Sequence, residues 1–183
     1  MDTAEPKKKV TGAELLGRAL ARQKVDTLFY LMGAPTYDAA NACKAEGIRI
    51  IDGRHEQGVA LMAQAHARVR GQPSVCMASS GPGTVNLASG LANALIDCAP
   101  VIALGGSSPV GQYGTGAFQE IDQVAVMRPV TKWAERVYEA KRIPQYVDQA
   151  FAQALAGKPG PVYLDLPGDV LDQEVEEDSI RWS

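Results

Sequence analysis

Short apolar segments alternate with helix-patterned segments along nearly the whole chain, and this alternation limits the possible folds more than any other feature. The apolar segments are continuous and bounded by glycine or proline, as in buried parallel strands; they cover residues 27–31, 48–51, 74–78, 100–104 and 161–166. The segments between them have apolar residues at helical spacing; they cover residues 36–46, 56–70, 84–98 and 144–155. The sequence therefore predicts an α/β fold of three α/β/α layers, with a doubly wound, mostly parallel sheet of about six strands.

The two ends of the chain lack this pattern. Residues 1–10 include three consecutive lysines and no apolar periodicity, so we expect a mobile tail. Thr11 and Glu14 have the spacing of a helix capping box, which predicts that the ordered domain begins with a helix and covers residues 11–168. Residues 169–183 are acidic, and we expect them to form a linker toward a further, missing domain.

A weaker segment at residues 132–137 is expected to form an edge strand. Its charged residues are Lys132, Glu135 and Arg136. Charged side chains on an edge strand oppose pairing with another chain, and we assign that role to all three.

Composition excludes several functional classes. The 183 residues include 18 Lys and Arg against 21 Asp and Glu, so the chain lacks the basic surface that nucleic-acid binding requires. No apolar run approaches the roughly 20 residues that span a bilayer, and the N-terminal residues do not have the order of a secretory signal. We therefore expect a cytoplasmic protein that does not bind membranes. Three cysteines and two histidines predict neither a disulfide framework nor a structural metal site.

Ligands of open parallel sheets bind beyond the carboxyl ends of the strands, so the loops that follow the strands form the candidate site. Three such loops cover residues 32–35, 52–57 and 79–86. The last contains Gly81 and Gly83, but Asn86 stands where a dinucleotide fingerprint needs a third glycine, and the chain has no Walker lysine. A Rossmann or P-loop site is therefore disfavoured.

Glu56 has two interpretations. It lies where the second strand gives way to a helix, and the helix dipole alone favours a carboxylate there. Alternatively, a partner covers the carboxylate, which then shares a proton with a ring nitrogen of a ligand. His55 is interpreted as a structural or pocket-wall histidine and not as the base of a nucleophile, because no Ser or Cys stands in a nucleophile-elbow pattern. Cys76 lies within a predicted buried strand and is expected to act as a small apolar group.

Four motifs occur in the order of a known family: Arg54-His55-Glu56-Gln57, Ser-Gly-Pro-Gly-Thr-Val-Asn at 80–86, Gly-Ala-Phe-Gln-Glu at 116–120, and Gly-Pro-Val-Tyr-Leu-Asp-Leu-Pro at 160–167. Together they resemble the N-terminal, pyrimidine-binding domain of thiamine-diphosphate-dependent enzymes. Within that family, the chain resembles the group of acetolactate synthases, 2-hydroxyacyl-CoA lyases and oxalyl-CoA decarboxylases. The resemblance extends from about residue 10 to about residue 179.

The resemblance implies a role for each matching residue. Glu56 is expected to bond to a pyrimidine nitrogen of thiamine diphosphate and to promote the tautomer that activates the cofactor. Gln119 is expected to face the substrate, so both would be catalytic. The residues expected to bind the cofactor are Gly33, Pro35, Glu56, Ser80, Gly83 and Asn86.

The resemblance also implies what this chain does not supply. The diphosphate and its Mg²⁺ would be bound by a separate domain, usually on the partner subunit, whose Gly-Asp-Gly motif is absent here. We expect a homo-oligomer or a complex with a separate chain, and an isolated chain that is inactive. The expected activity is that of an acetolactate synthase-like transferase acting on a small 2-keto acid.

Two alternatives remain open. One is the same domain of a 2-hydroxyacyl-CoA lyase or oxalyl-CoA decarboxylase acting on an acyl-CoA, which Gly116 and Gln123 slightly favour. The other is a nucleotide-binding or regulatory module without chemistry of its own.

Overall fold

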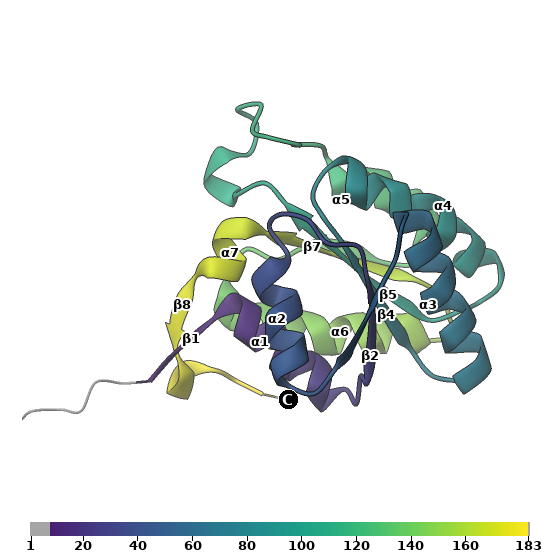
Figure 1. The fold of residues 1–183 in the computed structure, drawn as a ribbon, viewed down its shortest axis with the longest axis horizontal. Helices are drawn as coiled ribbons and strands as arrows, with labels where there is room; N and C mark the ends of the chain where they lie inside the picture. Colours follow the sequence, from purple (N-terminus) through teal and green to yellow (C-terminus); the bar gives the residue numbers. More distant parts are fainter. Residues whose placement is uncertain (1–7, 183) are drawn as a thin grey trace, which may run out of the picture.

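A computed structural model describes residues 8–182, in which a six-stranded sheet lies between two layers of helices (Figure 1). The strand order is β3–β2–β4–β5–β7–β6, and every neighbouring pair is parallel. The strands are β2 (Thr27–Tyr30), β3 (Arg49–Asp52), β4 (Ser74–Ala78), β5 (Val101–Ser107), β6 (Ala134–Arg136) and β7 (Val162–Pro167). The predicted three-layer fold with a parallel sheet of about six strands is confirmed.

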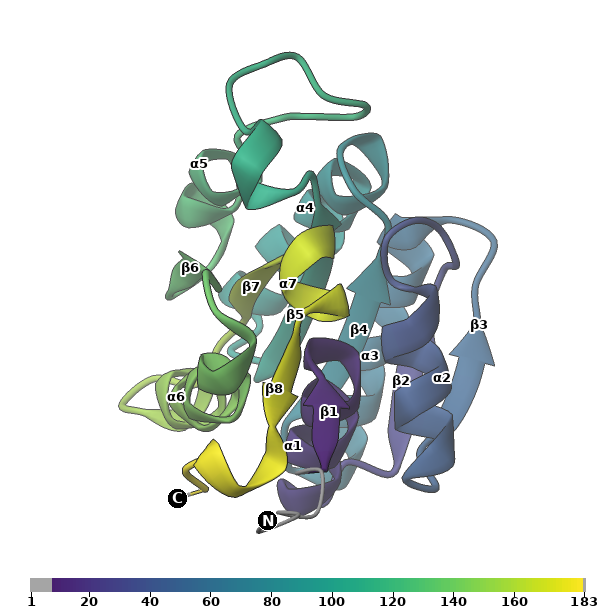
Figure 2. The same cartoon turned by 90° about the vertical axis from the view of Figure 1, so that its left-hand side faces the viewer.

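Helices cover both faces of the sheet (Figures 1 and 2). One layer contains α1 (Gly12–Arg22), α2 (Tyr37–Ala45) and α6 (Ile143–Leu155), and the other contains α3 (Glu56–Arg70), α4 (Pro82–Ile96) and α5 (Gln123–Met127). Successive strand residues point to opposite faces, so Val75 and Met77 pack into the first layer while Cys76 and Ala78 pack into the second. Because both faces are buried, the strands are apolar throughout instead of alternating. Short 3-10 helices lie at Val110–Gln112, Arg128–Val130, Ala140–Arg142 and Glu177–Ser179.

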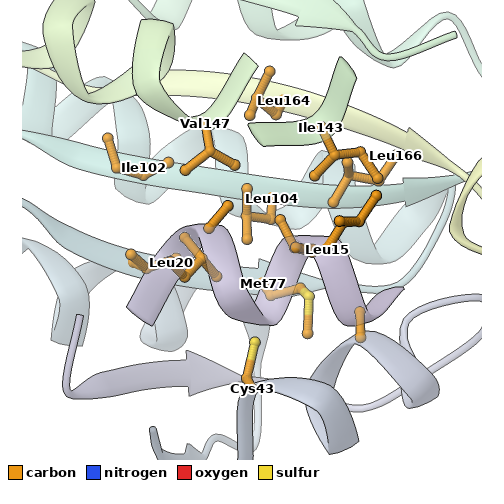
Figure 3. Packing of buried hydrophobic residues seen from close by; sticks show 14 of the residues in the cluster. Leu15, Leu20, Cys43, Met77, Ile102, Leu104, Ile143, Val147, Leu164 and Leu166 are labelled. Carbon is orange, nitrogen blue, oxygen red and sulfur yellow. The ribbon is translucent and has the colours of Figure 1, made fainter. Parts of the chain in front are cut away.

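Helix α1 begins at the predicted capping box. The Glu14 N–H donates to Thr11 Oγ1 at 3.2 Å, and the Thr11 N–H donates to the Glu14 carboxylate at 2.7 Å. Two of the backbone donors that a helix start leaves open are thereby satisfied. Figure 3 shows Leu15 and Leu20 of this helix in the same buried cluster as Met77 of the sheet.

The two ends of the described chain pair with each other. Strand β1 (Lys9–Thr11) is antiparallel to β8 (Glu174–Glu176), and the two lie side by side in Figure 2. Helix α7 (Gly168–Asp172) leads from the main sheet to β8. Val10 of β1 and Val170 and Leu171 of α7 belong to the buried core.

These ends differ from the expected mobile tail over 1–10 and acidic linker over 169–183. Residues 1–7 and 183 lie outside the described residues, but residues 9–10 form part of a strand, and 169–176 contain a helix and a second strand. The pairing joins two three-residue strands from opposite ends of the chain. Segments this short have no measurable periodicity, so their pairing is not visible in the sequence.

Strand β6 forms an edge of the sheet as predicted, but Arg136 does not protect that edge. Its side chain is buried, and its Nε donates to Oδ2 of Asp165, which is fully buried on β7. Lys132 does not protect it either: its Nζ donates to the carbonyls of Gln153 and Ala156, both at 2.6 Å, at the end of α6. Of the three charged residues, Glu135 alone is exposed on the strand.

No helix within residues 8–182 is both long enough and apolar enough to cross a membrane.

Replacing Arg136 with methionine would leave the buried Asp165 carboxylate without its cation. Removing one partner of a buried ion pair costs about 3–5 kcal/mol, so we expect the free energy of unfolding, from urea denaturation at pH 7, to fall by about that amount. The control is Glu135→Met on the exposed side of the same strand, which should change it by less than about 0.5 kcal/mol. Equal losses in the two variants would show that the ion pair contributes nothing to stability.

Candidate functional site

The residues that the sequence assigned to the site lie in loops or helix starts beyond the carboxyl ends of the strands. Gly33 and Pro35 follow β2, Glu56 follows β3, Ser80, Gly83 and Asn86 follow β4, and Gln119 follows β5. These strands are parallel neighbours, so their carboxyl ends meet at one edge of the sheet. The structure divides the residues at this edge into two adjacent groups.

The first group is built around the Glu56 carboxylate. Glu56 is the first residue of α3, is 8 % exposed, and accepts at Oε2 a hydrogen bond of 3.0 Å from Asn86 Nδ2 on α4. His55, just before it, caps the helix by accepting at Nδ1 from the Gln57 N–H, at 3.1 Å, which agrees with a structural role for this histidine. The other carboxylate oxygen, Oε1, has no hydrogen-bond partner among the described residues.

The backbone of residue 83 lies close to Glu56 Oε1 because this residue is glycine. A Cβ at Gly83 would lie 3.2 Å from this oxygen and 2.3 Å from Ser79 Oγ. A Cβ at Gly33 would lie 2.4 Å from Ser79 Cβ. Two glycines from different loops therefore bring their backbones close to Ser79, beside the Glu56 carboxyl group.

Ser79 was missed by the sequence reasoning. The available clue was its position next to Ser80, within the loop between β4 and α4. A hydroxyl without a motif of its own does not stand out in a sequence, and only the approach of the two glycines shows that Ser79 is central.

The second group faces a different space. Ser80 Oγ donates to Gln119 Oε1 at 3.0 Å. Pro35 and Ser80 line a cavity of about 320 Å³, which the exposed Phe118 ring also borders. Glu56, Gly83 and Asn86 do not line this cavity. The consecutive residues Ser79 and Ser80 join the two groups.

A buried side chain holds the loop that carries both serines. Gln123 of α5 accepts from the Gly81 N–H and donates to the Gly106 carbonyl at 2.9 Å and to Asp165 Oδ1 at 2.7 Å. Gly81 has φ +60°, and a Cβ there would lie 2.4 Å from the Gln119 carbonyl oxygen. A glycine is thus required both for the backbone conformation and for the close contact. The sequence reasoning noted Gln123 as a family likeness and missed this support.

Two buried titratable groups near the site, Cys76 and Tyr163, are held in their neutral forms. Burial raises the pKa of the Cys76 thiol to about 12, so no thiolate forms there near neutral pH, in line with the apolar role expected for it. Burial, and then the nearby Asp165, raise the pKa of Tyr163 well above its ordinary range. Neither side chain is therefore equipped to exchange protons at neutral pH.

The largest of the cavities described here lies away from this edge of the sheet. A cavity of about 720 Å³ lies between α6 and the last described residues, and it includes none of the expected site residues. Within residues 8–182, no group of three or more Cys, His, Asp or Glu side chains is placed to hold a metal ion.

Comparisons with known proteins agree with the likeness noted in the sequence. Residues 10–126 match the family described as "Thiamine pyrophosphate enzyme, N-terminal TPP binding domain". This region includes all the loops that form the two groups.

Individual relatives point the same way. The chain is 42 % identical over 163 residues to a chloroplastic acetolactate synthase of Arabidopsis thaliana, covering 88 % of this chain and 24 % of the relative. It is 40 % identical over 171 residues to the large subunit of acetolactate synthase isozyme 1 of Escherichia coli (strain K12), covering 92 % and 30 %. It is 36 % identical over 173 residues to 2-hydroxyacyl-CoA lyase 1 of Homo sapiens, covering 94 % and 30 %.

The chain thus spans about a quarter to a third of the length of these relatives. The family match covers more than half of the chain, and the identities above extend over most of it. The chain therefore belongs to the thiamine pyrophosphate enzymes and contains their N-terminal TPP-binding domain.

Proposed function

We propose that this chain binds the pyrimidine half of thiamine pyrophosphate and serves an enzyme that forms or cleaves carbon–carbon bonds. When bound, the cofactor supplies a nucleophilic carbon and a ring that accepts electrons. The observation that carries the proposal is the Glu56 carboxyl group, with one oxygen held by Asn86 and the other unpartnered beside Gly83.

Glu56 is suited to hold a proton against a ring nitrogen. The hydrogen bond from Asn86 fixes the orientation of the carboxyl group, because it engages Oε2 alone and leaves Oε1 to face the ring. Glu56 is only 8 % exposed, so most of its side chain is shielded from water, and a bound ring would cover Oε1 itself. A carboxyl group placed in this way acts as a general acid or base within hydrogen-bond reach of the ring.

Ser80, Gln119 and Pro35 are proposed to act on the substrate side. They border or adjoin the 320 Å³ cavity, next to the Glu56 group and separate from it. In this proposal one face of the loop from Ser79 to Asn86 contacts the cofactor, and its Ser80 end contacts the substrate.

The rest of the active site is proposed to come from another domain. That domain would bind the diphosphate and Mg²⁺ and cover the exposed side of the Glu56 group, either in a partner subunit of a homo-oligomer or in a separate chain. The relatives, which are about three to four times longer than the matched region, are consistent with such a domain. A cytoplasmic location is part of the same proposal.

For the substrate, we propose a small 2-keto acid and an acetolactate synthase-like transfer. The alternative, an acyl-CoA in a lyase or decarboxylase, is supported by the similarity to 2-hydroxyacyl-CoA lyase 1. Gln123, which seemed to favour the lyases, bonds to groups inside the protein, so the structure explains its presence without a substrate contact.

The pyrimidine site is testable on this chain alone, with the free 4-aminopyrimidine portion of thiamine as the probe. We expect millimolar binding, seen as NMR shifts of the Ser79, Gly83 and Asn86 amides. Gly83→Ala should weaken the binding at least about tenfold, because the new methyl group collides with Ser79 Oγ and displaces the groups beside Glu56 Oε1. Gly58→Ala, a substitution on α3 with no atom within 4 Å of the new methyl group, should leave binding unchanged. Equal binding by both variants would overturn the placement of the ring.

The role of Glu56 is testable in the complete enzyme, meaning this chain together with the domain that binds the diphosphate. Glu56→Gln keeps the shape of the side chain but removes its exchangeable acid proton. Hydrogen–deuterium exchange at the reactive cofactor carbon should slow by about 10²–10⁴-fold. Glu46→Gln, at an exposed residue that ends α2, should have no effect. Normal exchange in a folded, cofactor-loaded Glu56→Gln enzyme would show that Glu56 has no role in catalysis and only occupies the start of its helix. This result would favour the alternative in which the chain is a binding or regulatory module.

A further inference from the structure

The Glu120 side chain accepts hydrogen bonds from several backbone N–H groups of the loop that carries Gln119. Its Oε1 accepts from the Gly114 N–H at 2.6 Å, and its Oε2 accepts from the Gly116 and Ala117 N–H groups at 3.1 and 2.9 Å. One carboxylate thus satisfies three backbone donors from the six preceding residues. Bonds from N–H groups to an ionised carboxylate are stronger than those between neutral groups.

Other packing does little to hold this loop. Phe118, inside the turn that Glu120 closes, is 81 % exposed. Gly114 and Gly116 have φ +85° and +75°, and a Cβ at either would meet no atom within 4 Å. Their glycines are therefore needed for the backbone path and not for close contacts. The Glu120 carboxylate holds this path together with the Thr115 hydroxyl, which donates to the Gln112 carbonyl, and the Ser108 hydroxyl, which donates to the Phe118 carbonyl.

The turn places the Gln119 side chain within hydrogen-bond distance of Ser80. Gln119 lies directly before Glu120 and has φ +56°, a conformation that a residue with a side chain rarely adopts. Its Oε1 accepts the Ser80 hydroxyl, and its backbone carbonyl packs against Gly81. The local contacts of Glu120 offset the cost of this conformation.

We propose that Glu120 is a positioning residue that shapes the loop so that Gln119 meets Ser80 and Phe118 stands at the mouth of the 320 Å³ cavity. The shaping of the loop is independent of what the protein binds. The consequence for substrate rests on the proposed function, because it assigns that cavity to the substrate side.

The carboxylate works in its ionised form. The N–H groups of Gly114, then Ala117, lower the pKa of Glu120 below its ordinary value of 4.5, and Arg136 on β6 adds to this. Asp122 and Asp169 also lie on or against the loop, but they accept from the Ala125 and Val110 N–H groups. The contribution of Glu120 to loop order is therefore complete above pH 4.5 and is lost as the pH falls through the lowered value.

The first test measures amide hydrogen exchange by NMR on this chain. In the unmodified chain, the Gly114, Gly116 and Ala117 amides should be protected at pH 6 and lose protection as the pH falls through the lowered pKa of Glu120. Glu120→Gln should lower their protection at least about fivefold at pH 6 and remove the pH dependence, while amides of β4 and β5 stay unchanged. Glu135→Gln, an exposed glutamate on β6, is the matched control and should behave as the unmodified chain. Unaltered protection in Glu120→Gln would overturn the proposal.

The second test separates the loop from the cofactor site. Glu120→Gln should bind the aminopyrimidine probe as the unmodified chain does, because Glu56 and Gly83 lie in the other group. In the complete enzyme, KM for the carbonyl substrate should rise at least about fivefold, while cofactor affinity and proton exchange at the cofactor carbon stay within twofold. An unchanged KM would overturn the positioning role even if Glu56 behaves as proposed. If the Glu56→Gln prediction alone failed, the result for Glu120 and the loop would still stand.

Discussion

The fully buried carboxylate of Asp165 makes the set of contacts on which the candidate site depends. Arg136, Ser107 and Gln123 all donate to it, from β6, β5 and α5. A charge inside a protein is stable only with such partners, so the three elements are held in one arrangement around β7. Gln123 extends the network to the Gly81 N–H, which means that the core, and not solvent, determines the position of the loop after β4.

That loop contacts both groups of the site because its two consecutive serines have different partners. Ser79 packs against Gly33 and Gly83 beside the Glu56 carboxyl group, whereas Ser80 lines the 320 Å³ cavity and donates a hydrogen bond to Gln119. A parallel sheet makes this possible, since it brings the ends of neighbouring strands to one edge. The strand ends position the Glu56 group, whereas Gln119 of the other group lies on a loop whose backbone donates three hydrogen bonds to the Glu120 carboxylate.

Sequence patterns predicted the regular elements well and the irregular ones poorly. The predicted segments at 74–78 and 56–70 coincide with β4 and α3, because burial on both faces and the capping pattern leave clear local patterns. Helix α5 was missed because it has only five residues, and the β1–β8 pair because its strands come from opposite ends of the chain. The prediction that Arg136 protects the sheet edge was wrong for a related reason. The sequence does not show that Arg136 forms an ion pair with the buried Asp165 on the neighbouring strand.

The sequence by itself determined the fold class, the family likeness and the identity of Glu56, Asn86 and Gln119 as candidates, since these depend on periodicity and on motifs a few residues long. The tertiary structure decided how these candidates are grouped. The contact between Asn86 and Glu56 joins residues thirty positions apart, and that between Ser80 and Gln119 joins residues thirty-nine apart. The roles of Ser79, Gln123 and Asp165 likewise depend on contacts with residues that are distant in the sequence. Contacts of this kind arise from the packing of whole elements, which no local pattern records.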